Sequence, residues 1–410
     1  MVGPMHVFIC GGTPGSGGFQ AHLRGILCSG AIPSDAEVHL LASPKLAEEL
    51  PSLDRNVSLV VEPLLDAASR FTRLVWWHRE FPLLVRKIRP DVILYPSPLI
   101  RRSERIAGIP YVVISENLLL FDNAELLRYA RTREFWKLVL LRVLHARSLK
   151  YADGVVFPTD YYERTMVRAI GNVRRSLVVY YGLDSAYATA PQHSRALGQR
   201  VDLLYVSPIL LYKHQWHVVR ATALLRERLG RDIRLTLVGG GEPAAQRKLA
   251  HVMSELGAAS FVTCTGPIPA YEMPAVYRKA DIFVFASSCE AFGLVLLEGM
   301  GVALPVACSN RSALPEILGP HGAYFDPENP HSIAKAVETL IEDDRRRMEC
   351  ASGAHERAKE FTWQRCAEQT FSFLRSVVEL KGNPSLGRAN PHTSDLGYHG
   401  DTPKGAGDGK

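Results

Sequence analysis

The stretch DIFVFASSCEAFGLVLLEGMGVALPVACS (281–309) decides the fold. An apolar run at 281–286 leads into a short polar loop, an apolar helical segment follows, and a second apolar run occupies 304–309. Continuous apolar runs are typical of parallel strands that are covered by helices on both faces. The stretch therefore predicts a strand–helix–strand unit whose polar loop lies at the carboxyl end of the first strand.

The same alternation extends through both halves of the 410-residue chain. Helical patterns at 214–229, 243–256 and 331–343 separate the apolar runs of the second half. The further strand candidates are 5–10, 37–42, 91–96, 110–115, 154–159 and 176–181 in the first half, and 202–207, 234–240 and 261–266 in the second. Repeated alternation predicts an α/β protein with two doubly wound, Rossmann-like domains.

Composition suggests where these domains end. Residues 185–200 are mostly small and polar without clear periodicity, which is typical of a linker between a first domain at 1–184 and a second at 201–380. Residues 381–410 are rich in Gly, Pro and polar side chains, and we expect a disordered tail there. The helix expected at 363–380 could pack on either domain.

Charge and cysteine usage narrow the class of protein. The formal net charge of +6 fits an anionic ligand or an acidic membrane surface, but the chain lacks the basic runs with interleaved aromatics of a nucleic-acid-binding protein. Its seven cysteines form no CxxC pair, so neither a zinc site nor a disulfide framework is indicated. With no secretory signal and no apolar run of about 18 residues, we expect a cytoplasmic location.

Two acids flank the apolar helix of the opening stretch. If both were helical, Glu290 and Glu298 would lie about 12 Å apart along the axis and about 80° apart around it, too far to act on one atom. They suit the two ends of a long ligand, while the helix start near Phe292–Gly293 offers free N–H groups to a phosphate. On spacing alone, a favourable first-turn acid and an internal salt bridge explain them equally well.

The surrounding motifs keep a recognisable order. Lys213 follows the first strand of the second half, LTLVGGGE (235–242) is a strand that runs into three glycines, and FTW (361–363) opens the last helix. With the 262–317 segment, which carries both acids, these motifs resemble the retaining GT-B glycosyltransferases of the family-four group (glycosyl transferases group 1). The resemblance covers about residues 203–373 and implies two domains that face a cleft.

The resemblance also implies roles for individual residues. Lys213 would neutralise the donor diphosphate, Glu290 would contact the donor sugar, and Glu298 would accept hydrogen bonds from the ribose. The remaining donor-binding positions are Phe292, Gly293 and Leu294 on the sugar and phosphate, Ile268 in TGPIP (265–269) along the base, and Gly239 and Gly240. One departure is Ser207–Pro208, which stands where the family often has Gly-Arg, so a second phosphate cation is missing from that place.

The first half offers weaker signals. CGGTPGSGGFQAHL (10–23) follows the first strand but breaks the dinucleotide fingerprint, which disfavours a dehydrogenase. In the GT-B interpretation Gly11 and Gly12 lie near the donor phosphate, and in the alternative they form an ordinary tight turn. Glu116 and Asn117 are candidates for contacting the transferred sugar or the acceptor, although a polar loop at the start of a helix explains them equally well.

A basic segment at 125–150 carries seven Lys or Arg against two acids, with Trp136 and several leucines interleaved. A basic amphipathic helix of this kind suggests docking on an anionic membrane surface. The alternative is a helix of the domain whose charged side is simply solvated.

Together these observations predict a metal-independent hexosyltransferase that needs no cofactor. It would move a sugar from a UDP- or GDP-sugar, of the mannose or glucose type, to a glycan, lipid-linked or small-molecule acceptor in polysaccharide biosynthesis. The resemblance implies retention through a front-face mechanism in which neither glutamate is a nucleophile. A GT-B-fold sugar-nucleotide epimerase and a non-catalytic GT-B scaffold remain the alternatives.

Overall fold

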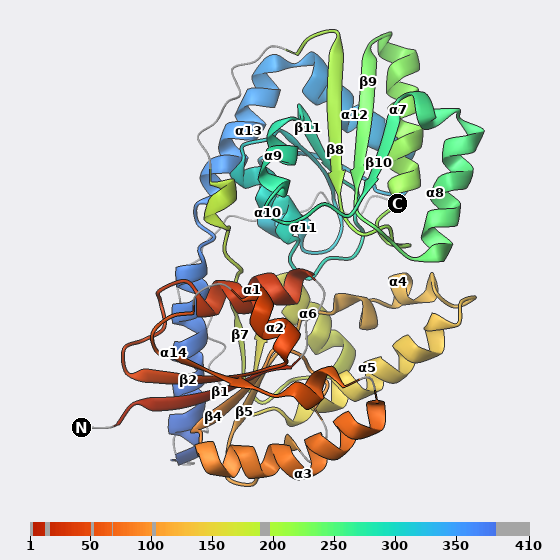
Figure 1. Cartoon of the computed structure of the whole chain (residues 1–410). Coiled ribbons are helices and arrows are strands. Elements are labelled where there is room, and N and C mark those ends of the chain that lie inside the picture. The colour runs from red at the N-terminus through yellow and green to blue at the C-terminus, as the bar shows by residue number, and fades with distance from the viewer. Residues whose placement is uncertain are drawn as a thin grey trace.

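The computed structural model describes residues 3–12, 17–50, 53–67, 69–100, 104–188 and 197–382. Two parallel sheets, each flanked by helices, lie one above the other, with the chain crossing between them twice (Figure 1). The predicted fold class is confirmed. Most of the predicted tail and the middle of the predicted linker lie outside the described residues.

The first sheet has seven strands in the order β3-β2-β1-β4-β5-β6-β7. Its central strands β4, β5 and β6 are buried along their whole length, as their uninterrupted apolar sequences require. The elements are β1 (Met5–Gly12), α1 (Gly17–Leu27), β2 (Ala36–Ala42), α2 (Pro44–Glu49), β3 (Val57–Val61), η1 (Pro63–Asp66), α3 (Arg70–Ile88), β4 (Val92–Tyr95), β5 (Tyr111–Ile114), η3 (Leu118–Leu120), α4 (Asn123–Leu127), α5 (Glu134–Tyr151), β6 (Gly154–Phe157), α6 (Asp160–Ile170), β7 (Ser176–Val178) and η4 (Ser185–Tyr187).

The second sheet has six strands in the order β10-β9-β8-β11-β12-β13. The opening stretch forms β11, α10 and β12, so the predicted strand–helix–strand unit is present. The elements are β8 (Arg200–Val206), α7 (Gln215–Leu229), β9 (Asp232–Val238), α8 (Pro243–Glu255), η5 (Ala258–Ser260), β10 (Val262–Gly266), α9 (Met273–Arg278), β11 (Ile282–Phe285), α10 (Leu294–Gly301), β12 (Val306–Ser309), α11 (Leu314–Leu318), β13 (Ala323–Phe325), α12 (Pro330–Glu342), α13 (Asp344–Ala358) and α14 (Trp363–Gly382).

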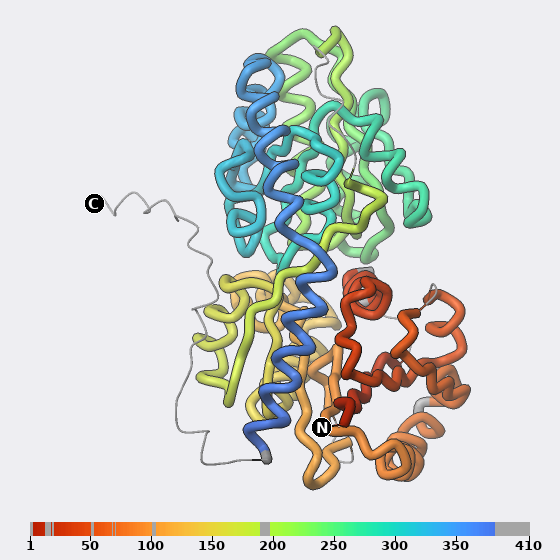
Figure 2. The backbone as a smooth tube through the Cα atoms, turned by 90° about the vertical axis from the view of Figure 1, so that its left-hand side faces the viewer, coloured from red at the N-terminus to blue at the C-terminus, as the bar shows by residue number. Residues whose placement is uncertain are grey.

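The last helix, α14, belongs to the second half of the sequence but packs on the first domain. It runs down from the upper domain along the side of the lower one (Figure 2) and contacts α1 and β6. Small residues permit this approach: a Cβ on Gly25 would lie 2.2 Å from the Trp363 ring, and one on Gly154 would lie 2.9 Å from the Phe373 ring. The chain therefore returns to its first domain after completing the second.

The basic segment of the first half forms two helices, α4 and α5, rather than one. Trp136, Leu140 and Val143 on α5 are 74%, 59% and 59% exposed, so apolar side chains face solvent there among basic ones. The Arg142 Nη1 donates a hydrogen bond of 2.5 Å to the Asn123 Oδ1 on α4. Among the described residues, no helix has the length and apolar content that crossing a bilayer requires.

Candidate active site in the interdomain cleft

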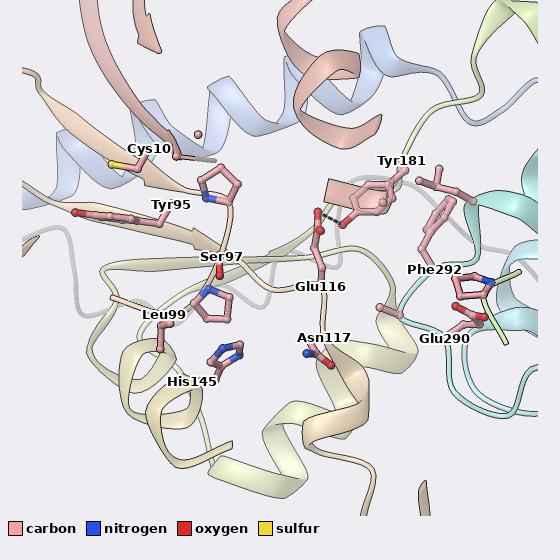
Figure 3. A pocket seen from close by; sticks show the side chains of 18 of the residues that line it. Cys10, Tyr95, Ser97, Leu99, Glu116, Asn117, His145, Tyr181, Glu290 and Phe292 are labelled. Carbon is pink, nitrogen blue, oxygen red and sulfur yellow. Dashed lines mark hydrogen bonds between the residues drawn. The ribbon is translucent and has the colours of Figure 1, made fainter. Parts of the chain in front are cut away.

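A cavity of about 900 Å³ lies between the carboxyl ends of the two sheets, lined from both domains (Figure 3). This is where an open parallel sheet places its ligands. Most of the candidate residues named from the sequence line it, although they come from loops distant in the chain. They are Gly11, Gly12, Glu116, Asn117, Lys213, Glu290, Phe292, Gly293 and Leu294.

Lys213 and Glu290 lie next to each other in the second-domain wall of this cavity and form an ion pair between Nζ and Oε1. Their side chains are only 8% and 15% exposed. The ammonium also lies 5.2 Å from the centre of the Tyr212 ring and 5.3 Å from that of Phe285, an aromatic setting that favours a cation. A buried positive charge with a single carboxylate partner is well placed to exchange that partner for a ligand anion.

Hydrogen bonds fix the loop that carries Glu290. Its backbone N–H donates to the Ser312 Oγ at 3.1 Å, and the Ser288 N–H donates to the Tyr212 carbonyl at 2.9 Å. The Ser288 Oγ is 2.8 Å from the His214 Nε2. Burial lowers the pKa of His214 to about 3, so this imidazole is neutral and serves the loop as a positioning group.

Helix α10 presents its N-terminus to the cavity. Gly293 precedes the helix with φ of 98°, a left-handed conformation that favours glycine, and a Cβ there would lie 2.9 Å from the Leu314 side chain. Among the residues that the structure describes, no side chain caps this end. The first N–H groups of α10 therefore remain available to an anion in the cavity, on the same side as Lys213.

The glycine pair at the end of β1 lies in the first-domain wall of the cavity. A Cβ on Gly11 would lie 2.9 Å from the Leu41 carbonyl oxygen, and Gly12 has φ of 69°. Both positions therefore disfavour a larger side chain. These two glycines bring backbone of the first domain to the cavity without a side chain in the way, as a close approach to a ligand requires.

Glu116 is held by groups that the sequence did not point to. Its Oε1 accepts a hydrogen bond from the Tyr181 O–H at 2.8 Å (Figure 3) and lies 2.7 Å from the His22 Nδ1. His22 comes from α1 and is buried against Tyr181 and Trp363. His22 lies in the glycine-rich stretch 10–23, but nothing in that motif singles it out, and only the tertiary packing of α1 on α14 shows that it orients this carboxylate.

Four of the predicted donor-binding residues lie outside the lining of this cavity. Gly239 and Gly240 follow β9 and interact with the neighbouring loops, where Gly239 N–H donates to the Gly266 carbonyl and Gly240 accepts from Ile209 N–H. Ile268 is half-buried beyond β10. Glu298 accepts a hydrogen bond of 2.8 Å from the Tyr277 O–H, and burial raises its pKa to about 7.

The cavity has a second cation that was not predicted. Ser207 and Pro208 line it as the sequence implied, so no arginine stands beside Lys213 on that loop. Among the described lining residues, the other cation is Arg73 of α3, in the first domain. Arg73 lies on α3, a helix in which the sequence shows no recognisable motif. The sequence therefore offered no reason to name Arg73 as a candidate.

Two groups of described residues bring carboxylate and imidazole atoms within 4.8 Å of one another, as cation ligands would. They are His6, Glu37 and His39, and Glu125, His214 and Glu328. None of these residues lines the cavity. In the second group the Arg128 guanidinium already pairs with both carboxylates, which disfavours a metal ion there.

Comparison with known structures identifies the class as GT-B. The sucrose-phosphate synthase of Thermosynechococcus elongatus superimposes with a TM-score of 0.73 at 19% identity, covering 92% of this chain and 99% of that one. HepE of Anabaena, in complex with UDP-glucose, gives a TM-score of 0.69 at 20% identity, covering 91% of this chain and 100% of that one. The two sheets and the cleft between them are thus a GT-B arrangement.

Sequence comparison relates the second domain to a family of glycosyltransferases. Residues 189–357 match the family model described as Glycosyl transferases group 1, which confirms the resemblance that the motifs carry. A D-inositol 3-phosphate glycosyltransferase of Corynebacterium glutamicum (strain R) is 32% identical over 179 residues, 42% of this chain and 43% of that protein. The chain spans about half the length of the relatives that it matches, and the family model covers the second domain. Neither the epimerase nor the scaffold alternative is favoured by these matches.

Proposed function

We propose that the protein is a retaining glycosyltransferase that moves a sugar from a nucleotide-sugar donor to an acceptor hydroxyl in the interdomain cavity. The observation that carries this proposal is the convergence of Lys213, Glu290 and the uncapped N-terminus of α10 on one wall of the cavity. This wall supplies a cation and N–H groups to a leaving diphosphate. The family match of the second domain and the UDP-glucose complex of HepE support it.

In the proposed reaction the donor diphosphate replaces the Glu290 carboxylate as the ion-pair partner of Lys213. The carboxylate is then free to accept hydrogen bonds from the donor sugar, while the N–H groups of α10 receive phosphate oxygens. Because the charge of the diphosphate is offset by these groups, the reaction needs no metal and no cofactor. Retention follows if the acceptor attacks from the face of the leaving phosphate, which accepts the proton.

The nucleoside would lie beyond the cavity, along the carboxyl ends of β9 and β10. Glu298 would accept hydrogen bonds from the ribose, Ile268 would lie along the base, and the Gly239–Gly240 backbone would pass close to both. The acceptor would enter from the first domain, where Glu116 and Asn117 line the cavity. The acceptor would be a glycan, a lipid-linked sugar or a small molecule, and the D-inositol 3-phosphate glycosyltransferase relatives support the last of these.

The exposed face of α5 would hold the protein at the cytoplasmic surface of a membrane. Arg133, Arg147 and Lys150 are exposed there beside Trp136 and Leu140. An apolar stripe with basic flanks favours an anionic bilayer surface. Such docking would suit an enzyme of polysaccharide biosynthesis.

A donor panel followed by one matched pair of variants tests the proposal. Thermal-shift measurements with UDP-, GDP- and ADP-sugars identify the donor, and turnover is then followed by release of the nucleoside diphosphate. We expect Lys213→Ala to lower kcat by about 10²-fold or more, because a preorganised cation on the leaving group is lost. Lys335→Ala, at an exposed position on α12, serves as the control, and equal turnover in the two variants would refute the assignment.

Measurements with the same donor distinguish the role of Glu298 from that of Lys213. We expect Glu298→Ala to weaken donor binding about tenfold and to change kcat little, since a ribose contact is present in both ground and transition state. Calorimetric binding and steady-state kinetics give both numbers. A loss confined to kcat would show that this carboxylate acts on the reacting sugar instead.

A further inference from the structure

The cavity continues well past the donor-binding wall into the first domain. Glu290 and Phe292 lie at one side, Glu116 and Asn117 in the middle, and Tyr95, Leu99 and His145 at the other side (Figure 3). This far part, the first-domain end, is formed by η1, the start of α3, the loop after β4, and α5. No element of the donor-binding domain contributes to it, so it is the place for the acceptor.

The wall of the first-domain end is largely apolar. Leu65 and Tyr95 are buried, and Leu99 is 39% exposed. Trp77 packs edge-on against Trp76 with ring centres 5.0 Å apart and lies 4.9 Å from the Phe81 ring. These rigid neighbours keep the wall in place when the cavity is empty. A sugar alone would leave such an apolar wall in contact with water.

At the first-domain end, the charge that a ligand can contact is positive. Arg73 lines it and has no ion-pair partner among the described residues. His145 is buried with its Nδ1 unpaired among those residues, and burial lowers its pKa to about 4, so it is neutral. Glu104 also lines the cavity, but it is buried and already engaged in an interaction of its own.

The surface beside this end is also apolar. Phe71 and Leu74, which flank Arg73 on α3, are 74% and 44% exposed, and Leu64, next to Leu65, is 42% exposed. Exposed apolar side chains next to a partly apolar cavity mark a binding surface more often than scattered ones do. A long apolar group that starts in the cavity could therefore continue over these side chains.

We propose that the acceptor is an amphiphilic phosphate, a sugar whose phosphate carries an alkyl or prenyl group. This inference rests on the glycosyl transfer proposed above. The apolar group lies against Leu65, Trp77 and Leu99, and the phosphate lies at Arg73. The sugar then reaches toward Glu116 and the donor. Charge complementarity at Arg73 and the apolar wall together select this class over a free sugar phosphate.

The test compares three probes that need no knowledge of the sugar. Octyl phosphate carries the charge and the apolar group, octyl glucoside lacks the charge, and glucose 1-phosphate lacks the apolar group. Calorimetry is performed on the 410-residue chain below the aggregation concentration of each amphiphile. We expect one-to-one binding of octyl phosphate about tenfold or more tighter than that of either other probe.

Two matched pairs of variants locate the binding. We expect Arg73→Gln and Leu99→Gln each to weaken octyl phosphate binding about tenfold. Arg79→Gln and Leu83→Gln, exposed positions on α3 outside the cavity lining, should leave it unchanged. Donor binding should be normal in all four, which separates this test from that of the proposed function. Equal affinity for glucose 1-phosphate, or equal effects in the control variants, would overturn the inference.

Discussion

At the scale of single residues, the two acids of the opening stretch have different surroundings. Glu290 lines the cavity beside Lys213, whereas Glu298 is turned away from it toward Tyr277. The sequence-based separation assumed one helix for both acids, but Glu290 lies in the loop before α10 and only Glu298 is helical. The sequence could not predict the partners, because Tyr277 and Lys213 reach them only through the packing of β8 and α9 beside β11. The order of the motifs therefore identified the candidate residues, whereas the charged and hydrogen-bonding partners of these residues are known only from the tertiary structure.

The raised pKa of Glu298 predicts a pH dependence of stability. The pKa is 4.5 for the free group and about 7 in the folded protein, so the folded state binds the proton more tightly. The corresponding stabilisation is present below about pH 4.5 and is lost as pH rises through 7. We expect it to amount to at most about 3 kcal/mol.

Urea unfolding of the ligand-free protein between pH 5 and 8 measures this effect. Glu298→Gln keeps the shape of the side chain without the titration, so the difference between the two proteins should shrink or reverse in sign as pH rises. A difference that is constant with pH would show that the Glu298 carboxyl is not buried in solution.

At the scale of elements, the apolar runs predicted the central strands well and missed two edge strands. In β3 (VSLVV) exposed and partly buried residues are mixed, and β13 has only three residues, so neither forms a long apolar run. The first-domain end of the cavity was also missed, since its wall comes from four separate elements without a shared motif. Patterns along the chain predict what is buried locally, while a ligand wall assembled from distant loops needs the fold.

The contact between α1 and α14 gives a test at a single glycine. Alanine normally stabilises a helix relative to glycine by about 1 kcal/mol. At Gly25, however, a Cβ would lie 2.2 Å from the Trp363 ring. We therefore expect Gly25→Ala to destabilise the protein by about 1–3 kcal/mol in urea unfolding. Adding Trp363→Leu should recover part of the loss, and a stabilised single variant would contradict the packing.

Helix α5 carries the prediction of membrane docking. Arg147 and Lys150 are exposed, whereas Arg142 already bonds Asn123, so the first two are the better probes. Each basic residue near an anionic surface contributes about 1 kcal/mol. We expect Arg147→Gln with Lys150→Gln to weaken sedimentation with acidic liposomes about tenfold. As the control, Arg345→Gln with Lys335→Gln removes the same charge from the second domain. If this control weakened sedimentation equally, the net charge of the protein and not the face of α5 would explain the binding.

At the scale of the whole molecule, the two domains are joined by contacts that surround the cavity. The Glu316 carboxylate of α11 accepts hydrogen bonds of 2.8 Å from the Asp160 and Tyr161 N–H groups at the start of α6. It also accepts one of 2.7 Å from the Tyr180 O–H. The Thr159 O–H donates to the Ala291 carbonyl at 2.8 Å, next to Glu290. The N-terminus of α6 thus holds the loop that carries the donor-site acid.

This arrangement predicts that Glu316 couples the domains. Removing the carboxylate removes its three hydrogen bonds to the Asp160 N–H, the Tyr161 N–H and the Tyr180 O–H, and bonds to a charged acceptor contribute about 1.5–3 kcal/mol each. We expect Glu316→Ala to split the calorimetric unfolding into two transitions and to lower kcat/KM about tenfold or more. Tyr180→Phe removes only one of the three bonds, so its effect should be intermediate. Glu356→Gln, exposed on α13, should behave as the unmodified protein, and a single unchanged transition in Glu316→Ala would mean that other contacts hold the cleft closed.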